Sequence, residues 1–570
     1  MSLPPLANLF AIYDPDPGAL AALERALRAS GEFRRVSRPA PAWVVATSPL
    51  PGGNGADPKV ADGAVEFVEG QDLVCERLEE LCQVTDRAPE RLARLPGDFG
   101  FVRFRPDGSA TAVRSCGGLV PFYLTRSRER IALATRLGDF ARYLEDEPRI
   151  DPLPNAVWAM GWPLFPDDRS FLTNVSVLPR GSFALLGSSG RTTTHRYWDP
   201  RPTRLELPTP ARAAEHAQRL RSLLVTKLER DLDPTGGNLL TLSGGVDSSS
   251  LAALAGGAVG RRFSTWSLLP EPDEMFRREF FYIDLLARRF NIERTWIARL
   301  GRETAIERSA PPVVFHVPHP ALCALPRVLA EADVRVLFGG EFADEVCGSV
   351  FTIPDWAQAT TLPDLVRGLR RLPFGRRAPL RWAKHRLLAL ARRPVLPFPR
   401  DLPQFVRPDV RQEYRAWAVG RRRAAASQPP AHRHLALRAE MDGFVAMNWE
   451  VASALGVRRS FPFFNREVLE LAFECHPSEL VGPGTKKLLR AALVDDVPHE
   501  NLFRPDKGHW GNYLRGVQFE SPARLPDALG SVVRPEWFPQ PPHLLDLLNA
   551  RALGVLTGFA TALAARRRLH

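Results

Sequence analysis

A serine- and glycine-rich stretch, Ser-Gly-Gly-Val-Asp-Ser-Ser at residues 243–249, has the composition of a phosphate-binding loop. It follows an apolar run suited to a buried strand and precedes apolar residues at helical spacing, so it connects a strand to a helix. Glycines let the backbone approach an anion closely, and N–H groups at the start of the helix can bind that anion. Serine hydroxyls add donors, and Asp247 adds a carboxylate suited to Mg²⁺. The loop lacks a lysine at the spacing of a Walker motif, which excludes that class of phosphate site.

A second group of acidic residues follows another strand-like run, at residues 334–340. Asp344 comes just after the carboxyl end of this strand, where open α/β sheets bind their ligands. We expect Asp247 and Asp344 to face each other and to hold Mg²⁺ together. The alternative is that these acids only complement the dipole of a helix. The residues expected to bind the nucleotide are Leu242, Ser243, Gly244, Gly245, Asp247, Ser248, Ser249 and Gly340.

The composition is that of a globular protein with an excess of positive charge. The chain has 570 residues, of which 45% are hydrophobic, and a formal net charge of +12. This charge favours an anionic partner such as ATP, an acidic peptide, nucleic acid or a lipid surface, without choosing among them. The six cysteines form no CxxC pair, which indicates reduced thiols packed as small apolar groups. No apolar run reaches the ~20 residues of a membrane span, so we expect a soluble cytoplasmic protein.

The chain divides into two regions with different patterns of expected elements. Residues 1–205 carry short strand-like runs, including a hairpin at 98–115 that turns at Pro-Asp-Gly. A proline-rich boundary lies at 200–208. After it, helices first alternate with strands in the rhythm of a parallel sheet and then dominate. The sequence therefore predicts an α+β region, 1–205, followed by an α/β region, 206–570.

These motifs resemble those of the synthetase domain of class B asparagine synthetases. In that family the loop is followed by Gly-Glu-Gly-Ser-Asp-Glu, whereas this chain has Gly-Glu-Phe-Ala-Asp-Glu at 340–345. The segment 438–473 looks like the family's helical segment, with Asn465 where an acid usually stands, and 485–510 is similar to its late basic motif. The resemblance implies an adenine nucleotide α-hydrolase-like domain with a parallel sheet and many helices, which uses ATP and Mg²⁺. It also implies that Lys507 contacts the adenylate.

The first region resembles a glutaminase-like (Ntn-type) α+β sandwich but departs from it at the nucleophile. A glutaminase needs cysteine after Met1, and this chain has Ser2. We therefore expect a degenerate glutaminase domain that releases no ammonia from glutamine. Members of the superfamily without this cysteine generally attack the adenylate with an amine of the substrate and close a ring.

Two kinds of ring-closing enzyme fit this resemblance: lasso peptide cyclases and β-lactam synthetase-like enzymes. The β-lactam group carries tyrosine where this chain has Glu341, which favours the peptide cyclase. Such an AMP-forming ligase adenylates an Asp or Glu side chain of a ribosomal precursor peptide and joins it to the peptide's N-terminal amine. Glu341 is the candidate base for that amine, and Lys507 the group that stabilises the developing oxyanion. A small-molecule amide synthetase, either β-lactam synthetase-like or asparagine synthetase-like, is the alternative among enzymes.

The altered motif at 340–345 also permits an alternative from another class, a catalytically silent scaffold that binds nucleotide or peptide. For the cyclase, the expected partners are the precursor peptide, a leader peptidase and a leader-recognition protein. Nucleic acid is not expected, because no binding module accompanies the charge. The arginine-rich segment 366–400 is compatible with a solvated helix face, an acidic-peptide dock or contact with a membrane surface. For His316 and His319 we expect a loop or pocket role rather than zinc binding.

Overall fold

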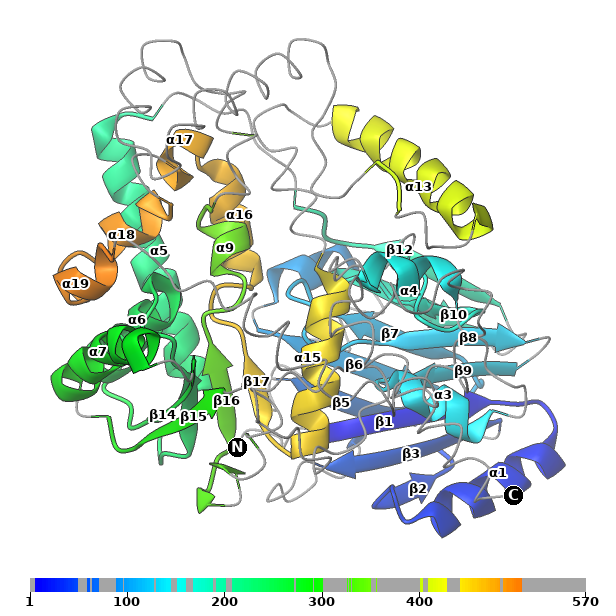
Figure 1. Cartoon of the computed structure of the whole chain (residues 1–570). Helices are drawn as coiled ribbons and strands as arrows, with labels where there is room; N and C mark the ends of the chain where they lie inside the picture. Colours follow the sequence, from blue (N-terminus) through cyan, green and yellow to red (C-terminus); the bar gives the residue numbers. More distant parts are fainter. Residues whose placement is uncertain are drawn as a thin grey trace.

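Three β-sheets form the framework of the protein (Figure 1). Two six-stranded antiparallel sheets come from the first region of the sequence, and a five-stranded parallel sheet comes from the second. The computed structural model describes residues 6–40, 42–49, 59–61, 64–70, 89–95, 97–127, 130–144, 151–159, 168–187, 191–200, 208–270, 273–290, 292–300, 325, 328–329, 331–349, 355, 400–402, 408–427, 441–481 and 485–504.

The two antiparallel sheets contain the twelve strands β1 to β12. The first sheet has the order β10 (Val175–Val177), β8 (Tyr123–Ser127), β9 (Arg130–Ala134), β1 (Leu6–Tyr13), β3 (Trp43–Pro49) and β2 (Arg35–Ser37). The second has the order β12 (Thr192–Arg196), β11 (Ser182–Leu186), β7 (Ala110–Arg114), β6 (Phe99–Phe104), β5 (Ala64–Gly70) and β4 (Lys59–Ala61). Their facing apolar side chains share one core cluster, in which Trp43 of β3 contacts Phe104 of β6.

The hairpin of β6 and β7 shows how the local sequence sets the register of the second sheet. Phe104 pairs with Ala110, and the turn between them contains Gly108 at φ +82°. A left-handed residue is needed to close such a short turn, and glycine adopts it without steric cost. The predicted hairpin at 98–115 is therefore confirmed.

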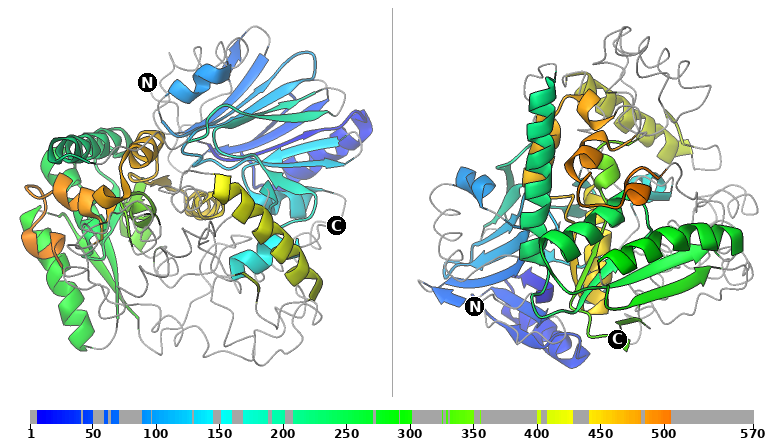
Figure 2. Two further views of the ribbon diagram at one scale, coloured as in Figure 1. Left: turned by 90° about the horizontal axis from the view of Figure 1, so that it is seen from above. Right: turned by 90° about the vertical axis from the view of Figure 1, so that its left-hand side faces the viewer.

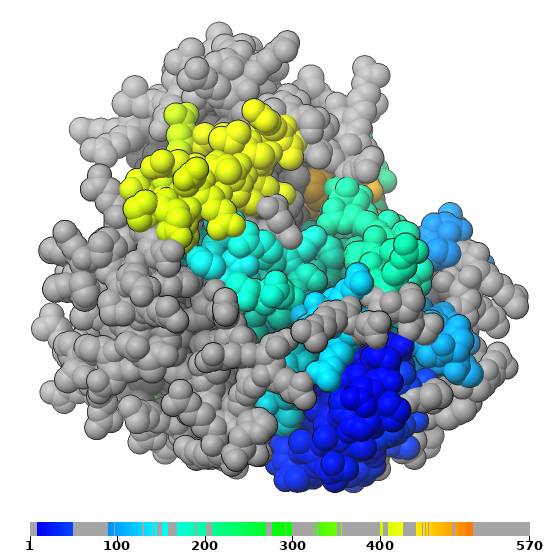
Figure 3. All heavy atoms as spheres, turned by 90° about the vertical axis from the view of Figure 1, so that its right-hand side faces the viewer, coloured from blue at the N-terminus to red at the C-terminus, as the bar shows by residue number. Residues whose placement is uncertain are grey.

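Helices cover the first region on its outer faces. They are α1 (Pro17–Ser30), the 3₁₀ helix η1 (Pro89–Arg94), α3 (Leu137–Tyr143) and α4 (Pro152–Ala159). The later helix α13 (Pro408–Ser427) returns to pack on α4 through a separate apolar cluster that includes Leu153 and Tyr414. Figure 3 shows α13 in yellow at the surface, beside segments of the first region in cyan.

The parallel sheet has the order β15 (Thr295–Leu300), β14 (Ser264–Pro270), β13 (Asn238–Thr241), β16 (Val336–Gly339) and β17 (Arg458–Ser460). Its central strand is buried on both faces, because Leu239 and Leu240 belong to two different core clusters. A strand covered on both faces needs apolar side chains on successive residues, and these two adjacent leucines supply them.

Helices pack on both faces of the parallel sheet. They are α5 (Pro210–Asp231), α6 (Val246–Ala253) with the π-helical turn η3 (Leu254–Ala258), α7 (Asp273–Arg289), α9 (Ala343–Val346), α15 (Asp442–Leu455), α16 (Arg466–Glu474), α17 (Pro477–Leu480), α18 (Lys487–Ala492) and α19 (His499–Leu502). Caps fix where several of them begin: Thr209 caps α5, which has proline at its first position, and Asn465 caps α16 by accepting the N–H of Val468. The asparagine that replaces the family's usual acid is thus a helix cap.

Helix α15 lies between the parallel sheet and the antiparallel sheets (Figures 1 and 2). It contributes Glu450, which accepts the N–H of Leu137 at 3.0 Å. A second buried link joins Lys227 of α5 to Asp98 of the first region at 3.0 Å and to Asp231 at 3.1 Å. The two regions are therefore fastened by buried polar contacts as well as by a shared apolar core.

The predicted fold class is confirmed, because the chain has an α+β two-sheet part followed by a parallel-sheet part with many helices. Strand β12 ends at Arg196 and α5 begins at Pro210, on either side of the predicted boundary. One local expectation is wrong: residues 458–460, within the segment expected to be helical, form strand β17, which extends the sheet beside β16. Among the described residues, no helix combines the length and the apolar character that crossing a membrane requires.

Candidate active site

The serine-glycine loop connects β13 to α6, as the sequence predicts. The helix begins after Gly245 without a side-chain cap. The hydroxyls bond within the loop instead: Ser248 Oγ lies 3.2 Å from Ser243 Oγ and 3.3 Å from the carbonyl of Gly245. The strand before the loop is held by Ser267, whose hydroxyl donates to the carbonyl of Leu242 at 2.7 Å. The loop is thus held in shape before any ligand binds.

Asp247 and Asp344 meet at one ammonium group. Lys486 Nζ donates to Asp247 Oδ2 and lies 2.9 Å from Asp344 Oδ1. Asp247 lies in the first turn of α6, after β13, and Asp344 lies in α9 after β16, the neighbouring strand in the sheet. The carboxyl ends of parallel strands lie at one edge of a sheet, which is why acids from distant parts of the sequence come together there. The ammonium group of Lys486 thus lies between the carboxylates of Asp247 and Asp344 at this edge.

Lys486 is buried and stays charged. Burial lowers its pKa, but Asp247 and Asp344 more than offset this effect, so the pKa is raised above its ordinary value. Its backbone adopts a left-handed conformation, with φ +61° and ψ +39°, at the start of α18, and its N–H donates to the carbonyl of Gly348 at 2.9 Å. A non-glycine residue in this region carries local strain, which often occurs at functional sites. Lys486 lies within the basic segment 485–510, and the sequence alone assigned this lysine no role.

Gly340 and Glu341 follow β16 directly beside the loop. A Cβ added at Gly340 would lie 2.7 Å from the Cβ of Asp247 and 3.0 Å from the N of Ser248, so only glycine fits there. Glu341 Oε1 accepts a hydrogen bond from Arg459 Nη2, and Glu341 Oε2 is buried without a hydrogen-bond partner among the described residues. The second oxygen therefore has unused capacity to accept a hydrogen bond.

Phe342 occupies the position of a glycine in the related motif, and its backbone keeps the conformation that glycine favours. Its φ is +70°, in the left-handed region. The ring stacks on Phe464 with centroids 4.1 Å apart and meets Phe461 and Phe444 edge to face at 4.9 Å and 5.3 Å. Aromatic packing thus holds a conformation that the side chain disfavours.

Most of the residues predicted for the site therefore lie at one edge of the parallel sheet: the 242–249 loop, Gly340, Glu341 and Asp344. Arg490 adds a second, half-buried cation near Asp247; burial lowers its pKa and the carboxylate of Asp247 partly offsets this. Lys507, His316, His319 and the segment 366–400, apart from its last residue Arg400, lie outside the described residues. Their predicted roles stay predictions.

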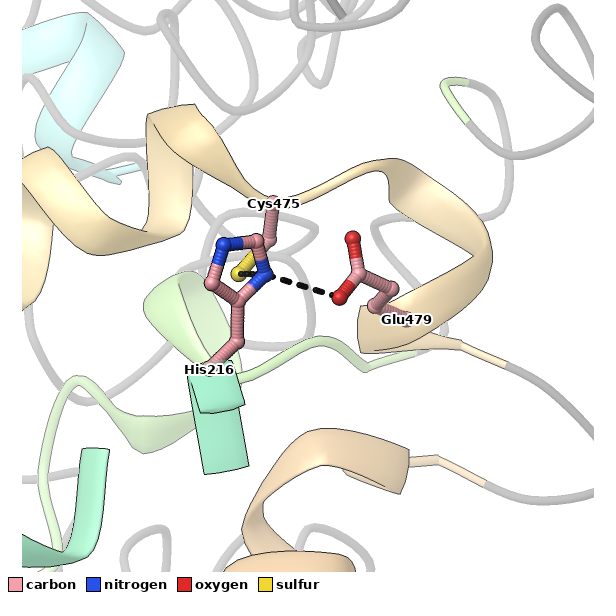
Figure 4. Close-up of side chains that lie close together, drawn as sticks. All are labelled: His216, Cys475 and Glu479. Atoms are coloured by element: carbon pink, nitrogen blue, oxygen red, sulfur yellow. Dashed lines mark hydrogen bonds and ion pairs between the residues drawn. The ribbon is translucent and has the colours of Figure 1, made fainter. Parts of the chain in front are cut away.

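Another buried group, His216, Cys475 and Glu479, joins α5 to the turn between α16 and α17 (Figure 4). His216 Nδ1 lies 2.8 Å from Glu479 Oε2 and 3.5 Å from Cys475 Sγ. A nucleophilic triad needs its two partners on different imidazole nitrogens, and here both contact the same one. Burial also raises the pKa of the Cys475 thiol, which opposes formation of a thiolate. Glu479 Oε1 accepts the N–H of His476, so this carboxylate already caps α17.

Solved structures with a weak likeness to this chain include the following three proteins. They are the allosteric regulatory enzyme of purine biosynthesis (10% identical, TM-score 0.23, 51% of this chain and 80% of that chain), the glutamine phosphoribosylpyrophosphate amidotransferase from B. subtilis (8% identical, TM-score 0.23, 53% and 68%), and NMN synthetase from Francisella tularensis (16% identical, TM-score 0.17, 24% and 57%).

Similarity in sequence is more informative. Carboxyethyl-arginine β-lactam synthase from Streptomyces clavuligerus is 29% identical over 227 residues, which are 39% of this chain and 41% of that protein. The match thus spans less than half the length of this relative. The family model for asparagine synthase matches residues 219–524, more than half of the chain, and this range contains the loop, both aspartates and Lys486. The chain therefore belongs to the asparagine synthase family.

Proposed function

We propose that the protein is an ATP-dependent, AMP-forming amide ligase that closes a ring in a ribosomal precursor peptide, as a lasso peptide cyclase does. Membership in the asparagine synthase family supports ATP-dependent amide formation. The observation that carries the assignment to this site is the meeting of Asp247, Asp344 and Lys486 beside the serine-glycine loop.

In the first step, ATP binds with its phosphates on the loop of residues 243–249. A carboxylate oxygen of the substrate attacks the α-phosphorus, the bond to the bridging oxygen breaks, and pyrophosphate leaves. Negative charge develops on the leaving pyrophosphate, and we assign its stabilisation to Lys486 and the N-terminus of α6, which lie beside the loop. Preorganised stabilisation of this kind contributes several kcal/mol.

The donor set at the sheet edge also fits Mg²⁺. Asp247 Oδ1 is buried without a hydrogen-bond partner among the described residues, and Asp344 supplies a second, more exposed carboxylate. Carboxylate oxygens combined with substrate phosphates are the ligands that Mg²⁺ prefers. When bound, the metal would neutralise charge on the phosphates. Asp247 and Asp344 are the residues that would hold it, and Lys486 would then turn to the phosphates.

In the second step, the amine of the same substrate attacks the acyl carbon and AMP leaves. The amine must lose a proton, and Glu341 Oε2 is the atom we propose to accept it. Arg459 holds the other oxygen of Glu341 and so fixes the direction of the carboxylate. We assign stabilisation of the oxyanion to Lys507, as the family resemblance implies.

Two sequence features support a peptide substrate: Glu341, where β-lactam synthetase-like enzymes carry tyrosine, and the net charge of +12. The peptide cyclase would act with a leader peptidase and a leader-recognition protein. A ring-closing synthetase for a small molecule is the second candidate, favoured by the similarity to carboxyethyl-arginine β-lactam synthase.

The test is pyrophosphate release by the full chain with MgATP and one of two substrates: a synthetic core peptide from a frame beside the gene, or carboxyethyl-arginine. We expect release with the peptide, and a peptide product lighter by one water in mass spectrometry. Release only with carboxyethyl-arginine would favour the second candidate. ATP binding without release under either condition would indicate a scaffold. Asp247→Asn is the control, since it keeps the side-chain volume and removes the charge, and it should abolish release.

A further inference from the structure

A buried asparagine from the end of the described chain holds the back of the serine-glycine loop. Asn501 lies in α19 and is fully buried. Its Nδ2 lies 3.5 Å from the carbonyl oxygen of Gly244, 3.2 Å from Ser249 Oγ and 3.0 Å from the carbonyl oxygen of Tyr282. One amide group thus contacts the loop, the first turn of α6 and helix α7.

The orientation of this amide follows from its neighbours. All three are oxygens, two of them carbonyls that only accept, so the NH₂ end must face them. Asn501 Oδ1 is buried without a hydrogen-bond partner among the described residues. Because its oxygen is buried without a partner, this amide adds little to the stability of the fold. Its NH₂ group, however, donates to backbone and hydroxyl oxygens, which an apolar side chain could not do.

The part of the loop that Asn501 contacts has little conformational freedom. Gly244 has φ +66°, and a Cβ there would lie 2.8 Å from the Cβ of Tyr282, so the loop backbone packs directly on α7. Asn501 bonds to the backbone carbonyls on both sides of this contact. The direction of the Gly244 peptide group, and with it the N–H groups that follow, depends on this bridge.

Helix α19 is itself anchored to α7 by residues near Asn501. Arg504 forms a buried ion pair with Glu279, and its guanidinium lies 4.2 Å from the centre of the Tyr282 ring. Burying an ion pair fixes geometry because both charges must keep their partners. Arg504 also precedes Lys507 by three residues in the sequence, so the same anchor adjoins the segment that carries the proposed adenylate lysine.

We propose that Asn501 is a positioning residue for the pyrophosphate part of ATP. It acts through Gly244 and Ser249 and orients the loop N–H groups toward the β- and γ-phosphates. This inference rests on the proposed function, because it assumes that the loop binds ATP. It adds a residue 252 positions away from Ser249 to the phosphate site.

The test compares Asn501→Asp and Asn501→Leu with the wild-type full chain. Both substitutions keep a side chain of similar size and remove the donors; aspartate also places a charge against the carbonyls. Calorimetry with magnesium pyrophosphate, MgATP and AMP is the measurement. We expect affinity for pyrophosphate and ATP to fall roughly tenfold or more, the effect of leaving buried acceptors without their donor, and affinity for AMP to stay within twofold.

Asn448 provides a matched control, because its Nδ2 donates to the carbonyl of Phe444 within its own helix, α15. Asn448→Leu should leave all three affinities unchanged. Variants of Asn501 that fold, by circular dichroism, and bind pyrophosphate as the wild type does would overturn the inference. An equal loss of AMP affinity would overturn it as well, since that indicates general distortion. If the wild type itself binds neither ATP nor pyrophosphate, the proposed function fails instead.

Discussion

The buried carboxyl of Glu450 makes the stability of the protein depend on pH in a predictable way. Glu450 lies in α15, between the two regions of the protein, and bonds to the N–H of Leu137 and to Tyr123. Burial raises its pKa from the ordinary 4.5 to about 7, and these two hydrogen bonds reduce the effect only in part. The folded protein therefore binds a proton that the unfolded chain releases.

The sign and size of the effect follow from this shift. A raised pKa means that protonation stabilises the folded state fully below about pH 4.5, and that this contribution is lost as the pH rises through about 7. At ~1.36 kcal/mol for each pKa unit, the difference between 4.5 and about 7 corresponds to about 3 kcal/mol. Above neutral pH, the wild type carries a buried carboxylate at this cost.

Glu450→Gln removes the titration and keeps the shape of the side chain. We expect the variant to match the wild type in urea unfolding near pH 4.5, and to exceed its free energy of unfolding by about 3 kcal/mol near pH 8.5. Glu215→Gln on the exposed face of α5 is the control and should leave the pH dependence unchanged. The reasoning is refuted if wild type and Glu450→Gln lose stability in parallel between these pH values.

Three further substitutions test the site. Lys486→Met leaves the buried carboxylate of Asp247 without its ammonium partner, so we expect a loss of about 3–5 kcal/mol in unfolding free energy and of pyrophosphate release; adding Asp247→Asn should recover stability but not activity, and no recovery would contradict the pairing. Glu341→Gln should keep ATP–pyrophosphate exchange and lose ring closure, and loss of both steps would exclude its role as base. Phe342→Gly relieves the strain of the left-handed backbone, ~1–2 kcal/mol, but loses ~3–5 kcal/mol of packing against Phe464 and its neighbours. The variant should therefore unfold at a lower temperature than the wild type, and an unchanged or higher Tm would show that the aromatic contacts contribute little.

Much of the fold could be predicted because its signals are local. The strand, loop and helix around residues 238–253 follow from an apolar run, two glycines and helical spacing within one short stretch. The hairpin of β6 and β7 follows from the apolar runs on either side of a turn containing Gly108. Strand β17 was missed because its three residues carry no periodicity, and only pairing with β16 makes them a strand.

Some residues of the candidate site could likewise be predicted from the sequence, and others could not. The two aspartates could be paired from sequence, because each follows a strand and parallel strands end at a common edge. Lys486 and Asn501 could not, since they lie 239 and 252 residues from the groups they contact and no local pattern records that distance.

The sequence by itself determined the functional groups available to this protein: a serine-glycine loop between a strand and a helix, acids at strand ends and a glutamate in place of a tyrosine. These features depend on residue type and on local conformation, which a few neighbouring residues determine. Only the tertiary structure decided that a lysine is buried between the acids, that Arg459 holds one oxygen of Glu341, and that α19 supports the loop from behind. Those contacts arise when helices from distant segments pack on one sheet. Once a charge or a hydrogen-bond donor is buried, its energy depends on the partner that this packing places beside it.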